Sequence, residues 1–247
     1  MSQDKGPEQI GSVIDFAAFR RRMREHLRPR EEVLAWEADL ARIERQGKHL
    51  GGRLSALVDW PAIQKPDRMD GDEACRVGFA WARAFMPGDP GAVVWGRAGT
   101  GKTTLCSHII NRLIGKEARV CALVSAPRLI DALHADRWHR DELIADVRHA
   151  DVLVLDDMGA STWQRGWGGN LLAVLDARWQ SRRRGNSSTL FTTNIKPKSL
   201  PCFGWEVKDE QDQRDWDRIN SRLKAMVGRI IEYGGDDRRR PAKEQGR

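Results

Sequence analysis

The sequence predicts an α/β fold in which helices cover a five-stranded parallel sheet. Short apolar segments alternate with amphipathic ones along most of the chain, which is typical of strands joined by helical crossovers. The third apolar segment is almost wholly apolar, as a strand buried on both faces of a parallel sheet should be. The strands are expected at residues 92–95, 119–126, 151–155, 188–193 and 229–233. Together these features favour three layers, with the sheet in the middle.

Apolar residues at helical spacing predict the connecting helices. The helix after the first strand places Cys106, Ile109, Ile110 and Leu113 on one face, and Gly115 is expected to end it. Two further helices are expected to begin at Pro127 and at Asp141. Three more are expected over residues 72–85, 170–182 and 213–227.

Composition narrows the class of protein. The chain has 247 residues, enough for one well-packed domain and an appendage. Its polar N-terminus has no secretory apolar core, and no apolar run approaches the roughly 18 residues of a membrane span, so we expect a cytoplasmic protein. The formal net charge of +7 suits a nucleic-acid partner without requiring one. The four cysteines are far apart and indicate neither a zinc ribbon nor a redox pair.

Three regions are expected along the chain. Residues 1–65 are interpreted as a helical N-terminal region with a linker, residues 66–237 as the α/β domain, and residues 238–247 as a basic, flexible tail. The linker is expected to start at Gly51 and Gly52, because paired glycines favour irregular backbone.

The N-terminal region contains an amphipathic helix that is expected to begin at Val13 and end at Leu27. Its apolar face is formed by four residues, Phe16, Phe19, Met23 and Leu27. A second, charged helix is expected over residues 31–46. Anchors at this spacing suit a helix that docks into a groove of a partner protein, although packing on its own domain is the alternative.

A glycine-rich motif follows the first strand. Residues 96–103 read GRAGTGKT, which fits the phosphate-binding pattern G-x-x-x-x-G-K-[ST] of nucleoside triphosphatases. Its glycines let the backbone turn successive N–H groups toward phosphate oxygens. Lys102 is expected to reach the β- and γ-phosphates, and Thr103 to bind Mg²⁺. The expected nucleotide-binding residues are Gly96, Arg97, Ala98, Gly99, Thr100, Gly101, Lys102, Thr103 and Thr104.

Polar residues follow two later strands. The third strand ends in Asp156 and Asp157, at the edge where open α/β sheets bind ligands. Asp156 is expected to hold Mg²⁺, and Asp157 to orient or deprotonate the attacking water. Asn194 follows the fourth strand and is expected to contact the γ-phosphate or that water. The sequence therefore places Asp157, Asn194 and Lys102 among the catalytic residues.

The segments GRAGTGKT, VLVLDDMG, LFTTN and RINSRL, in this order and spacing, resemble the DnaC/IstB-like branch of AAA+ ATPases. The best match is to bacterial and phage replicative helicase loaders, and it covers residues 72–239. The resemblance implies an AAA+ three-layer sandwich that binds and hydrolyses ATP with Mg²⁺. It also implies side-by-side assembly with ATP between subunits. Arg222 matches the family's arginine finger, and Arg218 is the second candidate.

The resemblance further implies partners. Loaders of this kind grip the hexameric replicative helicase through an N-terminal helical region, a role for which the helix from Val13 to Leu27 is placed. They also hold single-stranded DNA, which requires basic and aromatic groups together. Residues 137–140 (RWHR) and 163–167 (WQRGW) have this mixture.

Three other functions remain as alternatives. An IstB-like helper of a DNA transposase shares the same ATPase core but binds duplex DNA and a transposase. A small-molecule kinase needs an arginine-rich lid over its acceptor, and no clear candidate follows the aspartate pair. A GTPase needs an N-K-x-D motif to read guanine, and the sequence contains none.

Overall fold

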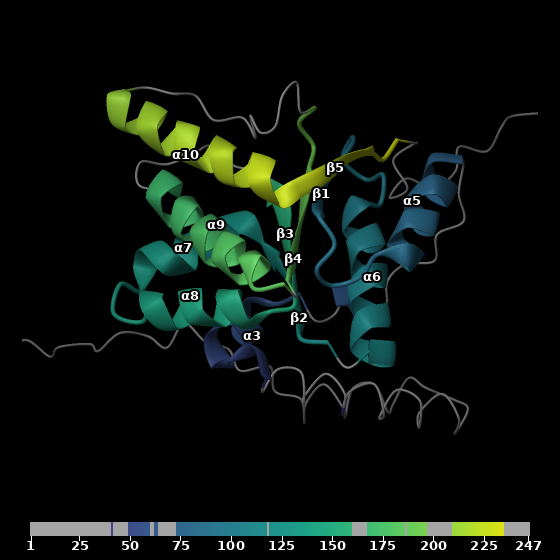
Figure 1. The fold of residues 1–247 in the computed structure, drawn as a ribbon, viewed down its shortest axis with the longest axis horizontal. Helices are drawn as coiled ribbons and strands as arrows, with labels where there is room; N and C mark the ends of the chain where they lie inside the picture. The colour runs from purple at the N-terminus through teal and green to yellow at the C-terminus, as the bar shows by residue number, and fades with distance from the viewer. Residues whose placement is uncertain are drawn as a thin grey trace, which may run out of the picture.

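The computed structural model describes residues 41, 49–59, 62–63, 73–117, 119–159, 167–185, 187–196 and 209–234. These residues form a five-stranded sheet in which all neighbouring strands are parallel, in the order β2-β3-β4-β1-β5 (Figure 1). The strands are β1 (Gly91–Trp95), β2 (Cys121–Ser125), β3 (Val152–Met158), β4 (Ser188–Thr193) and β5 (Val227–Glu232). The expected α/β fold with a five-stranded parallel sheet is confirmed.

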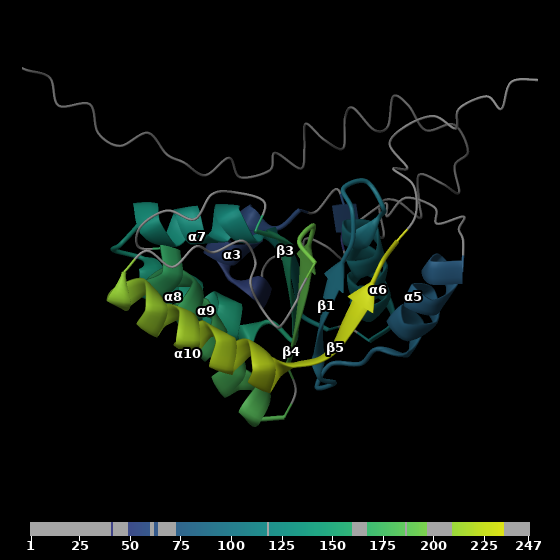
Figure 2. The ribbon, with the colours of Figure 1, turned by 90° about the horizontal axis from the view of Figure 1, so that it is seen from above.

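Helices lie on both faces of the sheet, so the molecule has three layers. One face is covered by α5 (Glu73–Ala84) and α6 (Lys102–Glu117). The other is covered by four helices, as the view from above also shows (Figure 2): α7 (Ala126–Ala135), α8 (Arg140–His149), α9 (Trp167–Arg183) and α10 (Glu210–Met226). Burial from both sides explains why β3 is apolar until its last residues.

The strand order decides which residues meet at the functional edge of the sheet. β4 lies between β1 and β3: Val94 of β1 pairs with Thr192, and Leu155 of β3 pairs with Phe191. The carboxyl ends of parallel strands lie at one edge of a sheet. The residues that follow β1, β3 and β4 are therefore brought together there, although long stretches of sequence separate them.

The segment expected to be a linker forms part of the domain core. Residues 52–57 form the helix α3 (Gly52–Leu57). Leu50, Leu54, Val58 and Ile63 are buried in the same apolar core as the sheet. The backbone N–H of Asp59 donates to a carbonyl of β2 at 2.9 Å. The linker interpretation is therefore wrong for residues 51–59 and 62–63, because the apolar residues Leu50, Leu54 and Val58, at four-residue spacing, outweigh the paired glycines.

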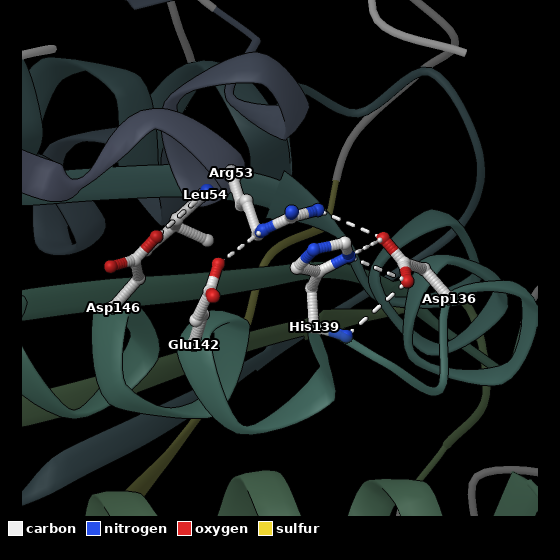
Figure 3. Close-up of polar contacts among 6 residues, drawn as sticks. All are labelled: Arg53, Leu54, Asp136, His139, Glu142 and Asp146. Atoms are coloured by element: carbon white, nitrogen blue, oxygen red, sulfur yellow. Dashed lines mark hydrogen bonds and ion pairs between the residues drawn. The ribbon is translucent and has the colours of Figure 1, made fainter. Parts of the chain in front are cut away.

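Charged side chains also hold α3 in place (Figure 3). Arg53 donates from Nη1 to Asp136 and from Nε to Glu142, each across 2.8 Å. Asp146 of α8 accepts from the backbone N–H of Leu54 at 3.3 Å and so caps the first turn of α3. These contacts join α3 to the end of α7 and to α8.

Two further outcomes concern helix limits. α6 continues past Gly115 to Glu117, so the expected end at that glycine is wrong. The buried side chains of Leu113 and Ile114 stabilise the last turn against the cost of a glycine in a helix, about 1 kcal/mol. The helices expected over residues 13–27 and 31–46, apart from Ala41, and the tail from residue 238 lie outside the described residues. In the described part of the chain, no helix is long and apolar enough to cross a membrane.

Candidate nucleotide-binding site

The glycine-rich loop connects β1 to the first turn of α6. Gly99 and Gly101 have φ values of 80° and 96°, a left-handed conformation that glycine adopts without strain. Gly96 is needed for a different reason: a Cβ added there would lie 2.0 Å from the carbonyl oxygen of Tyr233, at the end of β5. The glycines of the motif thus meet two separate requirements. Gly99 and Gly101 allow positive φ values in the loop, and Gly96 allows the backbone after β5 to approach closely.

Lys102 begins α6 and lies inside the loop, with 6% of its surface exposed. Its Nζ donates to the carbonyls of Gly96 at 3.0 Å and Arg97 at 2.8 Å, and to Asn194 Oδ1 at 2.7 Å. These three oxygens are neutral, so they orient the ammonium group without forming an ion pair with it. A charge held in this way is suited to the phosphates of a nucleotide.

The other loop residues lie around this lysine as the motif requires. Thr100 is buried, and its hydroxyl donates to the carbonyl of Arg97 at 3.0 Å, which closes the turn. Arg97 and Ala98 are exposed, while Thr104 is half-buried on α6. Residues 96–101 thus form one continuous loop, whose backbone lies at the carboxyl edge of the sheet.

Thr103 and Asp156 face one another across the loop. The Thr103 hydroxyl lies 3.0 Å from each carboxylate oxygen of Asp156. Burial raises the pKa of Asp156, and the neighbouring charge of Asp157 acts in the same direction, whereas hydrogen bonds from Thr192 and Thr103 lower it. A cation beside this carboxylate would offset its desolvation.

The donor set of this pair fits Mg²⁺. A hydroxyl and a carboxylate supply the hard oxygen ligands that this ion prefers. Among the described residues, no group of three or more His, Cys, Asp or Glu side chains gathers as a self-sufficient metal site. Thr103 and Asp156 would therefore share the ion with phosphate oxygens and water, which is the usual arrangement for Mg²⁺ at a nucleotide.

Asp157 lies at an irregularity of β3. The pairing of β3 with β4 shifts register between Leu155 and Met158, and Asp157 has a φ of 56°. Aspartate is one of the few residues that tolerate this region, and a bulge of this kind re-aims side chains at the end of a strand. Its carboxylate makes no hydrogen bond or ion pair within the described part of the chain. Asp157 is therefore available to a water molecule at the site.

Thr192 was missed by the sequence interpretation. Its buried hydroxyl donates to Asp156 Oδ1 and accepts the backbone N–H of Asp157 at 3.0 Å. Thr193, also buried, donates to the carbonyl of Met158 at 2.6 Å. The two threonines thus fix the irregular end of β3. Two consecutive hydroxyl residues after the apolar pair Leu190 and Phe191, just before Asn194, were the available signal.

The two arginines of α10 form a separate cluster with α9. Arg222 donates from Nε to Asp176, and Arg218 lies 3.9 Å from the same carboxylate. The guanidinium carbon of Arg222 is 4.4 Å from the ring centroid of Trp179. The structure brings Lys102, by contrast, to the residues of β3 and β4. Among the described residues, no hydrogen bond or ion pair of Asp176, Arg218 or Arg222 reaches the phosphate loop.

The two candidate DNA-binding segments differ. Trp138, in the connection between α7 and α8, is 94% exposed and lies between Arg137 and Arg140. Trp167 is only 4% exposed, because it packs into the core at the first turn of α9. The expectation that residues 163–167 contact DNA therefore gains no support from Trp167, whose ring is buried, and residues 163–166 lie outside the described part of the chain.

The fold and the edge of the sheet together define an AAA+-type P-loop domain. The chain is similar to the crystal structure of DnaI, with 25% sequence identity, a TM-score of 0.52, and coverage of 70% of this chain and 87% of that one. A proposed primosome component from Streptococcus pyogenes serotype M3 has 19% identity and a TM-score of 0.54, over 72% of this chain and 91% of that chain. AMPPCP-bound DnaA from Aquifex aeolicus has 17% identity and a TM-score of 0.52, and the match covers 68% of this chain and 49% of that chain.

These similarities confirm, at the level of the fold, the resemblance to DnaC-like AAA+ proteins that four sequence motifs indicated. What this chain shares with DnaI, the primosome component and DnaA is the fold of the domain. No protein-family model matches the chain, and no curated protein matches it.

Proposed function

We propose that this chain is an ATPase that uses ATP and Mg²⁺ to load a replicative DNA helicase onto single-stranded DNA. The ATPase part is carried by one observation: two contacts, Lys102 with Asn194 and Thr103 with Asp156, lie side by side at the carboxyl edge of the sheet. They join the first turn of α6 to β3 and to the end of β4. A glycine turn with a surface lysine would require none of these contacts.

Each residue has a property that phosphoryl transfer to water requires. Lys102 balances negative charge on the β- and γ-phosphates, and the backbone N–H groups of the loop bind phosphate oxygens. Thr103 and Asp156 hold Mg²⁺, which neutralises phosphate charge when it is bound. Asp157 orients or deprotonates the attacking water, and Asn194 contacts the γ-phosphate. Because the side chain of Asn194 is exposed, it can leave its hydrogen bond with Lys102 and bind a phosphate oxygen instead.

The DNA-binding part rests on the connection between α7 and α8. Trp138 projects into solvent, and arginines precede and follow it at positions 137 and 140. An exposed indole can stack on an unpaired base, and adjacent arginines can bind phosphates. The contacts of Arg53 with Asp136 and Glu142 hold both ends of this connection, so the indole is presented from a fixed base.

The partner-binding part rests on the N-terminal amphipathic segment, for which DnaI and the primosome component provide the context of replication. Phe16, Phe19, Met23 and Leu27 recur on one helical face, as a groove-binding helix requires. Because residues 49–59 belong to the domain core, the partner-binding region is confined to the residues before them.

The test is to mix the purified protein with the replicative helicase of its own source, ATP and Mg²⁺, and to measure the mass of the complex by light scattering. We expect a stoichiometric complex that is lost when residues 1–46 are deleted and when Phe16→Ser and Phe19→Ser are combined. The matched control is Arg22→Ser, off the apolar face, which should bind normally. A deletion variant that melts at the temperature of the intact protein shows that the domain itself remains folded.

The alternative is an IstB-like helper of a transposase, since this group shares the ATPase core. It predicts ATP-dependent assembly on duplex DNA and no complex with the helicase. That outcome in the same light-scattering experiment would replace the loader assignment while leaving the ATPase assignment intact.

A further inference from the structure

Three residues of α9 and two of α10 form a cluster away from the phosphate loop. The helices pack against one another along the side of the molecule (Figures 1 and 2). The members of this cluster, which we call the α9–α10 cluster, are Asp176, Trp179, Arg183, Arg218 and Arg222. It contains three arginines and one carboxylate, so it carries an excess of positive charge.

Arg222 is held in two independent ways. Its Nε donates to Asp176 Oδ1, and its guanidinium plane lies over the ring of Trp179, 4.4 Å from carbon to centroid. Arg183 lies over the same ring at 5.0 Å. One edge and one face of the Arg222 guanidinium are therefore occupied. Its position is fixed although 29% of the side chain is exposed.

The remaining donors of Arg222 are uncommitted. A guanidinium has five N–H donors in a planar fork, and Nε accounts for one of them. Within the described part of the chain, neither Nη atom of Arg222 makes a hydrogen bond or ion pair. The Nη groups are those that bind two oxygens of a phosphate at once. An arginine that only joined two helices would gain nothing from leaving four donors free and oriented.

Arg218 differs from Arg222 in each of these respects. Its side chain is 61% exposed, its ion pair with Asp176 spans 3.9 Å, and no aromatic ring of the described residues lies under its guanidinium. A guanidinium without such support loses more conformational entropy when it binds a phosphate. Of the two arginines on this face of α10, Arg222 is the one that is preorganised.

We propose that Asp176 and Trp179 are positioning residues that hold Arg222 ready for the terminal phosphate of ATP bound by a second copy of this chain. This inference rests on the proposed ATPase function and specifies how its intersubunit arginine is presented. In the described part of the chain, the hydrogen bonds, ion pairs and ring contacts of these residues do not reach the phosphate loop of the same subunit, and we therefore place the anion that they suit in another molecule. Asp176 holds the Nε edge of the Arg222 guanidinium by a hydrogen bond, and the ring of Trp179 supports one face of it.

The test is a double-mutant cycle on steady-state ATP hydrolysis, measured at a protein concentration at which the chain is assembled. We expect Arg222→Ala to lower kcat about 10³-fold. Asp176→Asn should lower kcat about tenfold to a hundredfold, because misplacing a catalytic group costs this much, with KM little changed. Asp176→Glu should recover part of the loss. Lys224→Ala, which changes an exposed residue of α10 outside the cluster, is the matched control and should hydrolyse ATP normally.

The double variant separates positioning from a structural role. If Asp176 acts through Arg222, then Asp176→Asn should cost nothing further in the Arg222→Ala background. A further loss in that background, or full activity of Asp176→Asn alone, overturns the inference. The same holds for Trp179→Leu. Equal melting temperatures of the control and Asp176→Asn would show that the effect is not unfolding.

A mixing experiment tests whether Arg222 acts across subunits. Lys102→Ala protein has an intact α9–α10 cluster but no functional phosphate loop. Adding it to Asp176→Asn protein should raise turnover several-fold above the sum of the two separate activities. No gain overturns the placement of Arg222 at a neighbouring site. Failure of the proposed function itself is distinguishable, because Lys102→Ala would then retain ATP binding whatever the cluster does.

Discussion

Lys102 Nζ donates a hydrogen bond to Asn194 Oδ1 across 2.7 Å, although the two residues are 92 positions apart in sequence. The contact exists because β1 and β4 are neighbours in the sheet, so the loop after β1 and the residue after β4 meet. It places a neutral amide oxygen where a phosphate oxygen can later bind. The lysine is thus oriented before the nucleotide arrives, which reduces the entropy lost on binding.

The first prediction concerns the charge of Lys102. Lys102→Ala removes the ammonium group that the loop carbonyls orient, so nucleotide affinity should fall at least ~10²-fold, as expected for loss of a charge-assisted hydrogen bond worth about 3 kcal/mol. Isothermal titration calorimetry with a non-hydrolysable ATP analogue measures this directly. Retained tight binding would contradict the site assignment.

Asn194 provides a sharper test of the same contact. Asn194→Asp keeps the shape of the side chain but places a carboxylate 2.7 Å from Lys102, so the lysine charge is neutralised where phosphate should bind. We expect ATP affinity to fall about tenfold or more. Asn194→Ala, which removes the amide without adding charge, should bind ATP nearly normally but hydrolyse it more slowly. Equal affinities of the two variants would show that Asn194 does not control this lysine.

Asp157 should affect hydrolysis without affecting binding. Asparagine tolerates the φ of 56° as aspartate does, so Asp157→Asn preserves the local backbone, and its amide oxygen can still accept a hydrogen bond from water. Loss of the charged base should slow turnover ~10²-fold while nucleotide affinity stays within about twofold. Single-turnover hydrolysis compared with calorimetry separates the two effects. Unchanged turnover would remove Asp157 from this role and leave the site without its proposed base.

The sequence predicted the residues whose chemistry is local and missed those whose role depends on distant packing. The loop, Asp156 and Asn194 were recognisable because motif spacing and strand ends report them directly. Thr192 was missed because its hydroxyl only acquires a partner once β3 and β4 pair. Arg178 is the extreme case: it is fully buried and donates to the carbonyls of Val147, Ala150 and Ser188 at the opposite edge of the sheet, yet no sequence signal distinguishes it from a surface arginine.

The paired glycines before α3 give the last prediction, because the structure assigns them opposite roles. Gly51 has a φ of 82°, and a Cβ there would lie 2.0 Å from Asp146 Oδ1, the carboxylate that caps α3. Gly51→Ala should therefore lower the free energy of unfolding by about 1–3 kcal/mol. Gly52 begins the helix and has no heavy atom within 4 Å of an added Cβ.

Gly52→Ala is thus the matched control and should be neutral, or raise the free energy of unfolding by about 0.5–1 kcal/mol, because alanine favours the helix. Urea denaturation of both variants measures the difference. If residues 49–59 were a linker, as the glycine pair alone suggested, both substitutions would leave the stability of the domain unchanged. A loss confined to Gly51→Ala instead requires α3 to be docked on α8 in solution.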